Sequence, residues 1–178
     1  MVLELKVPQG DTPSALIPLV PVFFSYVLSF IYLGIYWNNH HHMLHVTERV
    51  TGGILWANLH LLFWLSLVPF ATGWMGQNHF AAAPTALYGV PLFMAGVAYL
   101  ILQQMIVRSQ GSDSVLAEAL GADFKGKISS VLYLLAIGSA FVNQWIADFL
   151  YVFIAAIWVV PDRRIERALN GRDRAAAR

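Results

Sequence analysis

Long apolar blocks dominate this 178-residue chain and leave few folds open to it. Hydrophobic residues make up 58% of the sequence and charged residues 12%, whereas soluble domains average about 45–50% and about 25%. The excess falls in blocks of about 17–24 residues, the length at which a helix rising about 1.5 Å per residue crosses a bilayer core about 30 Å thick. The chain is therefore predicted to be all-α, an integral membrane protein that forms one compact helical bundle.

Five membrane spans are predicted from these blocks. They cover approximately residues 14–36, 54–72, 85–107, 128–142 and 144–160. A transmembrane domain is thus expected over residues 1–160, followed by a basic tail over 161–178. The connector before the fourth span could hold a short helix that begins after Asp113 and stops at Gly121.

Proline, glycine and turn positions give finer expectations for these spans. Pro69 is expected to kink or end the second span. Gly89 and Gly96 are expected to be close packing positions in the third span. The last two spans meet at a tight turn around Asn143, so they are predicted to be antiparallel neighbours.

Basic residues are distributed unevenly between the two sides of the predicted bundle. One side has only Lys6. The other side collects Arg49, Arg108, Lys125, Lys127, Arg163, Arg164, Arg167, Arg172, Arg174 and Arg178. Because lysine and arginine concentrate in cytoplasmic loops, the tail and the crossing between the first two spans are predicted to be cytosolic. The protein is therefore expected in the cell membrane as a multi-pass protein, with its N-terminus outside.

The crossing between the first two spans is rich in histidine. His41 and His45 are four residues apart and His42 and His45 three, which are spacings that can bind zinc. Glu48 is the only acid at a matching position, and the chain has no cysteine. Imidazole groups also suit the C-terminal end of a helix dipole. Hydrogen bonding or an interfacial position is therefore the preferred interpretation, and neither a metal nor a cofactor is predicted.

Two polar side chains fall inside the second apolar span. Asn58 and His60 would each cost several kcal/mol there without a hydrogen-bond partner. The nearest candidate partners across the turn are Asn39, His40 and His41. A hydrogen-bond clamp between two helices is the favoured interpretation, and a proton or ion pathway is the alternative.

Other polar and aromatic positions have simpler interpretations. Asp148 is the only acid inside a predicted span, and it is expected at the interface because it lies close to a turn. An aromatic belt at the span ends is predicted to contain Tyr36, Trp37, Trp74, Trp145 and Trp158.

The sequence has no nucleophile elbow, phosphate loop or paired carboxylates, so no enzyme is predicted. Its net charge of +1 gives no indication of nucleic-acid binding.

Short phrases of this sequence resemble a known family. The specific ones are YWNNHH at 36–41 and LWANL at 55–59, supported by SLVPF at 66–70 and LELKVP at 3–8. These phrases are similar to those of the endosomal and lysosomal potassium channel family, the transmembrane protein 175 type, in its bacterial branch. The resemblance extends over nearly the whole chain, although the last three spans match mainly in pattern.

The resemblance implies a passive potassium channel in the lipid bilayer. It implies six helices per subunit, a homotetramer and a central pore lined by a first helix that opens with an Arg-x-x-x-Phe-Ser-Asp motif. This sequence lacks that motif, and Met1–Val7 resembles only the outer end of the pore helix. The resemblance also implies a polar shell that supports the pore helix and consists of Trp37, Asn39, His40, His41 and Asn58. His60 is added to this shell because it is expected to be buried in the second span.

The chain as given is therefore expected to lack most of its first helix and not to conduct alone. Either the start is assigned too late or the chain is a true short form, and an outside N-terminus without a signal peptide favours the first explanation. Two other functions stay open. One is a structural or regulatory membrane subunit without transport, and the less favoured one is a haem or metal protein that uses His60 with His40 or His41.

Overall fold

The helices observed follow the predicted apolar blocks. The computed structural model describes residues 7–8, 11–45, 47, 49–110 and 124–159. In chain order the elements are η2 (Pro13–Leu19), α1 (Val20–His45), α2 (Gly52–Gln77), α3 (Ala82–Gln110), α5 (Phe124–Ser139) and α6 (Gln144–Val159). The predicted all-α membrane bundle is confirmed. The expected helix between Asp113 and Gly121, and the basic tail, lie outside the described residues.

The helices differ in length. Within the described residues, three stretches are long and apolar enough to cross a membrane: Pro13–His45, Gly52–Gln77 and Ala82–Gln110. Helices α5 and α6 lie at the last two predicted spans but have 16 residues each. At about 1.5 Å per residue each is about 24 Å long, less than a hydrocarbon core of about 30 Å. That both of them cross the membrane stays a prediction.

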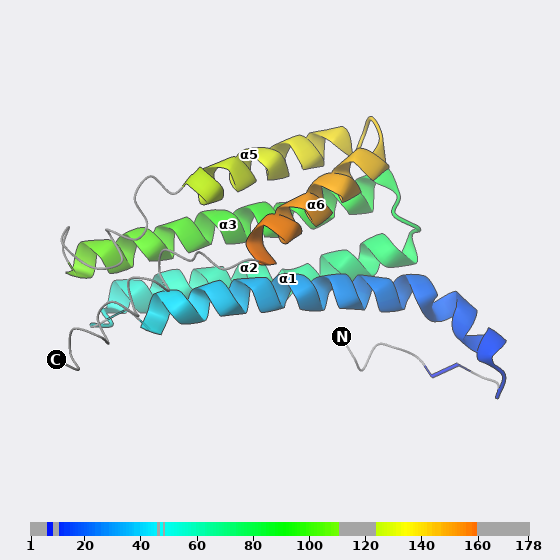
Figure 1. The fold of residues 1–178 in the computed structure, drawn as a ribbon, viewed down its shortest axis with the longest axis horizontal. Coiled ribbons are helices and arrows are strands. Elements are labelled where there is room, and N and C mark those ends of the chain that lie inside the picture. The colour runs from blue at the N-terminus through cyan, green and yellow to red at the C-terminus, as the bar shows by residue number, and fades with distance from the viewer. Residues whose placement is uncertain (1–6, 9–10, 46, 48, 111–123, 160–178) are drawn as a thin grey trace.

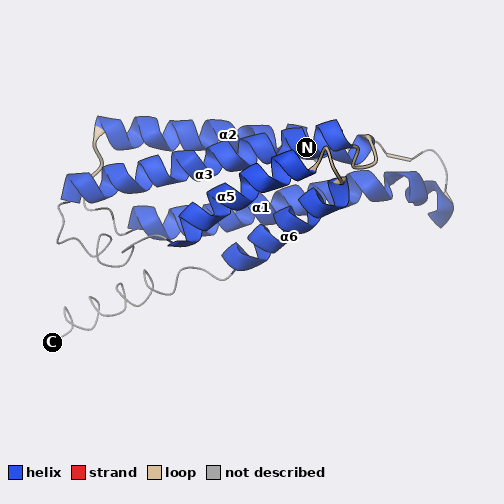
Figure 2. Cartoon of the chain, turned by 90° about the horizontal axis from the view of Figure 1, so that it is seen from above, coloured by secondary structure: helices blue, strands red, loops and turns tan. Residues whose placement is uncertain are grey.

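The long helices run side by side as an elongated bundle (Figure 1). Helix α2 packs most extensively against α3, while α1 covers α2 and α5 covers α3. Helix α6 returns against α5, as predicted from the turn at Asn143, and also contacts α3 and α1 (Figure 2). The turns at 78–81 and 140–143 share one end of the bundle, called here the Asn143 end. Residues 49–51, just before α2, lie at the opposite end, called the Arg49 end.

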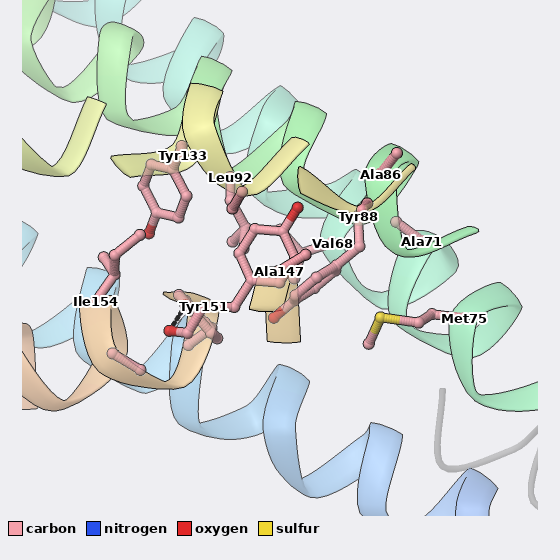
Figure 3. Packing of buried hydrophobic residues seen from close by; sticks show 14 residues of the cluster. Val68, Ala71, Met75, Ala86, Tyr88, Leu92, Tyr133, Ala147, Tyr151 and Ile154 are labelled. Carbon is pink, nitrogen blue, oxygen red and sulfur yellow. Dashed lines mark hydrogen bonds between the residues drawn. The ribbon is translucent and has the colours of Figure 1, made fainter. Parts of the chain in front are cut away.

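Tyrosine rings fill much of the core near the Asn143 end (Figure 3). The hydroxyl of Tyr32 in α1 donates a hydrogen bond to the backbone carbonyl of Tyr151 in α6. The hydroxyl of Tyr151 in turn donates to the carbonyl oxygen of Thr85 in α3, at 3.1 Å. Three helices are thus joined by side-chain-to-backbone bonds, which matter in a membrane because no water replaces them.

Of the two glycines predicted as close packing positions, one is confirmed. A Cβ on Gly89 would lie 2.3 Å from the Tyr151 hydroxyl and 2.5 Å from Cγ1 of Ile137. The nearest atom to a Cβ on Gly96 is the Tyr36 hydroxyl at 3.8 Å, an ordinary contact, so the prediction for Gly96 is wrong. The difference arises because Gly89 faces both α5 and α6, and this arrangement is set by the tertiary packing.

Candidate functional site

A hydrogen bond between α1 and α2 brings together two of the predicted site residues. Nε2 of His40 lies 2.6 Å from Oδ1 of Asn58. Because an amide oxygen only accepts, the imidazole nitrogen is the donor, which leaves Nδ1 of a neutral ring as an acceptor. Both side chains are half-buried and lie near the Arg49 end. The pair joins the two helices in the way expected of an interhelical clamp.

Asn39 lies beside this pair in sequence but contacts other groups. It is buried, with 6% of its surface exposed, and its amide donates to the carbonyl oxygen of Ile35 at 2.9 Å. Its own backbone carbonyl accepts a hydrogen bond from the hydroxyl of Tyr99 in α3, at 3.3 Å. Asn39 therefore connects α1 to α3 rather than to α2.

His60 is bonded within its own helix. The indole Nε1 of Trp64 donates to Nε2 of His60 at 2.9 Å. The expectation that His60 finds its partner among Asn39, His40 and His41 is therefore wrong. Side chains four residues apart on a helix are neighbours, so an indole at this spacing satisfies the imidazole without help from α1.

Trp37 and His41 lie on a different, exposed face of α1. Their rings stack with centroids 5.4 Å apart, and the ring of His45 continues the stack 6.2 Å beyond His41. Trp37 is 65% exposed. The structure therefore does not bring Trp37 and His41 into contact with the His40–Asn58 pair. They form an aromatic stack on the outward surface instead.

The histidines do not gather into a ligand set. In the part of the chain that the structure describes, no three His, Cys, Asp or Glu side chains are placed to hold one metal ion. Nε2 of His40 is hydrogen-bonded to Asn58, and Nε2 of His60 is hydrogen-bonded to Trp64. Glu48, the acid considered with His41 and His45, lies outside the described residues.

A cavity of about 40 Å³ lies beside Asn39, between α1, α3, α5 and α6. Several aromatic rings line it, including Tyr36, Tyr99 and Trp158. The indole of Trp158 donates to Oγ of Ser129 at 2.8 Å, which ties α6 to α5 at the cavity wall. Trp158 was expected in an interfacial belt, and its bond to Ser129 has no signal in the sequence because it depends on how two helices pack.

Two partners in the site were missed from the sequence. Trp64 could have been found, because it follows His60 by four residues in an apolar span. Tyr99 could not, because it lies 60 residues from Asn39 and meets it only through helix packing.

The chain is similar to several known potassium channels. A family model described as "Endosomal/lysosomal potassium channel TMEM175" matches residues 1–69. A potassium channel of Chryseobacterium sp. (strain P1-3) is 52% identical over 170 residues, which cover 96% of this chain and 88% of that relative. A potassium channel of Streptomyces collinus (strain DSM 40733 / Tue 365) is 28% identical over 159 residues, covering 80% of this chain and 75% of the relative.

The fold also matches a solved structure. The crystal structure of a lysosomal potassium-selective channel TMEM175 homolog from Chamaesiphon minutus superimposes with a TM-score of 0.72. The match covers 89% of this chain and 86% of that one at 22% identity. The two chains therefore share a fold.

Proposed function

Because this chain belongs to the endosomal/lysosomal potassium channel family TMEM175, we propose that it is a channel subunit through which potassium flows passively down its gradient. The observation that carries the proposal is the 52% identity to the Chryseobacterium potassium channel over 96% of this chain. The fold shared with the Chamaesiphon minutus homolog agrees with it. Passive conduction needs no catalytic residues, and the polar contacts described above serve to join helices.

The conducting form is a tetramer with a central pore. This assembly is implied by the resemblance of the YWNNHH and LWANL phrases to the family. Helices α1 and α2 present large exposed rings, among them Phe30 at 67%, Trp37 at 65% and Trp56 at 75%. Such surfaces suit lipid or a neighbouring subunit.

The polar contacts near the Arg49 end form the shell that supports the pore-lining helix. The His40–Asn58 bond fixes the separation of α1 and α2, and Asn39 anchors α1 to α3. Trp37 and His41 occupy the exposed face of α1, where another helix could contact them. His60 acts more indirectly, since its bond to Trp64 stays within α2.

In this proposal, Met1–Val7 corresponds to the outer end of the family's pore-lining first helix. The similarity of Met1–Val7 to the outer end of that helix supports this part of the proposal. The Arg49 end and the C-terminus face the cytosol, in keeping with the positions of the basic residues.

Potassium flux into liposomes tests the proposal. Two forms are reconstituted: the chain as given, and the chain extended at its N-terminus by an apolar helix that opens with Arg-x-x-x-Phe-Ser-Asp. Potassium flux is expected from the extended form, and the chain as given is the comparison. Flux from the 178-residue chain would reject the need for a preceding helix, and absence of flux from both would count against the channel proposal in favour of a non-transporting subunit.

The supporting role of the polar shell is tested in the conducting form. His40→Ala and Asn58→Ala are each expected to lower the flux or weaken the tetramer, because each removes one partner of the bond between α1 and α2. Asn38→Ala is the matched control, an amide on the same helix. Flux and tetramer mass unchanged in both shell variants would contradict this role.

A further inference from the structure

Two buried oxygen atoms near the Asn143 end have no hydrogen-bond partner among the residues that the structure describes. One is Oδ2 of Asp148, in the second turn of α6, and the other is the hydroxyl of Tyr88 in α3. Tyr88 is fully buried, with 0% of its surface exposed. Asp148 precedes Tyr151 by three residues on α6, so the two side chains are neighbours on one face, and the Tyr151 ring packs against the Tyr88 ring at 5.0 Å. Buried polar atoms are nearly always satisfied in folded proteins, so each of these two oxygens calls for a partner.

The Tyr88 ring is held firmly in this position. It packs edge-to-face against Tyr151 at 5.0 Å (Figure 3) and against Tyr32 at 6.0 Å, so that α6 and α1 both constrain it. The hydroxyl of Tyr151 donates to Thr85, but its oxygen keeps lone pairs, and Tyr151 follows Asp148 by three residues on the same face of α6. The surroundings of the carboxylate therefore offer two phenol oxygens.

Among the residues that the structure describes, no lysine or arginine lies at the Asn143 end of the bundle, where Asp148 lies. Of the residues that the structure describes, every lysine and arginine belongs to the opposite, Arg49 end of the bundle: Arg49, Arg108, Lys125 and Lys127. His79, on the turn at the Asn143 end, is exposed. An acid within a membrane bundle normally has a positive partner, so a positive ligand is the expected occupant.

We propose that Asp148 and Tyr88 bind a monovalent cation, sodium or potassium, which enters from the Asn143 end. The single carboxylate balances one positive charge, and the phenol oxygen of Tyr88 completes an all-oxygen environment of the kind that hard cations prefer. Asp148 is half-exposed and lies five residues after Asn143, which gives the ion a short route from water. This site is separate from the proposed pore and does not rest on the channel proposal.

Thermal unfolding of the purified chain in detergent tests the site. Sodium or potassium chloride replaces N-methyl-D-glucamine chloride at constant ionic strength and constant pH. The expected result is a saturable rise of the Tm with sodium, potassium or both. The rise is expected to disappear in Asp148→Asn and to need a several-fold higher cation concentration in Tyr88→Phe. Asp11→Asn, which changes an exposed acid before η2, is expected to respond like the unaltered chain.

Several outcomes would overturn the proposal. A Tm that does not depend on the cation would mean that a water or a proton satisfies the two oxygens. An undiminished response in Asp148→Asn would place any cation elsewhere. If Asp148→Asn cannot be purified, Tyr88→Phe decides alone, because it keeps the carboxylate. An unchanged cation midpoint in Tyr88→Phe would then reject the two-residue site.

Discussion

The hydrogen bond from His40 to Asn58 shows how a few polar side chains act in an otherwise apolar bundle. At 2.6 Å it joins α1 to α2, where hydrocarbon on the outside offers no replacement for either partner. Removing one partner leaves the other unsatisfied, whereas removing both can cost little more than removing one. The two side chains are therefore expected to be energetically coupled.

A double-mutant cycle measures this coupling. His40→Ala, Asn58→Ala and the double variant are unfolded thermally or chemically in detergent. A coupling energy of about 0.6–1.7 kcal/mol is expected, the range found for interhelical hydrogen bonds in membrane proteins. The control cycle combines Asn58→Ala with His41→Ala, whose ring contacts only its own helix in the observed stacks. The control is expected to be additive within about 0.3–0.5 kcal/mol. Additivity in both cycles would contradict the clamp.

At the scale of helices, the residues that matter most are those that allow close approach. Helix α2 continues from Gly52 through Pro69 to Gln77, so Pro69 does not end the span, which was one of the two outcomes expected of it. One proline removes a single backbone bond, and packing in a bundle can compensate for it. Gly89, in contrast, is the position where the rings and side chains of α5 and α6 approach the backbone of α3.

Substitution of Gly89 is expected to disturb this contact. In Gly89→Ala the new methyl group would fall 2.3 Å from the Tyr151 hydroxyl and 2.5 Å from the Ile137 side chain. Overpacking of this kind typically costs about 1–3 kcal/mol of unfolding free energy. Gly138→Ala is the matched control, because nothing lies within 4 Å of its Cβ. The control should be neutral or stabilising by up to about 1 kcal/mol through helix propensity. Equal unfolding midpoints for the two variants would show that α3 has room at Gly89.

At the scale of the whole molecule, the charge asymmetry predicts how the bundle sits in the membrane. The described lysines and arginines all belong to the Arg49 end, while the Asn143 end carries Asp148. Basic loops are retained in the cytoplasm during insertion. The turn that contains Arg49 is therefore expected inside, and the turn that contains Asn143 outside.

Cysteine labelling tests this orientation on a clean background, because the chain has no cysteine. In intact cells, a membrane-impermeant maleimide is expected to label Asn143→Cys and not Arg49→Cys. After permeabilisation both variants should react, since both positions are exposed in turns. The reverse pattern in intact cells would invert the proposed topology. The unaltered chain serves as the unlabelled control.

The sequence by itself determined the class of this protein and the places where polar contacts were needed. Apolar blocks of membrane-spanning length allow only helices here, because every backbone group must be bonded inside the bilayer. For the same reason Asn58 and His60 had to find partners. The YWNNHH and LWANL phrases led to the right family, which the 52% identity to a potassium channel shows.

Only the tertiary structure decided which partners these side chains found. Asn58 bonds to His40 across two helices, whereas His60 bonds to Trp64 on its own. Tyr32 reaches the carbonyl of Tyr151, 119 residues away. Helices that are apolar on all sides carry little information about which face turns inward, so their rotation and neighbours are set by side-chain packing within the assembled bundle.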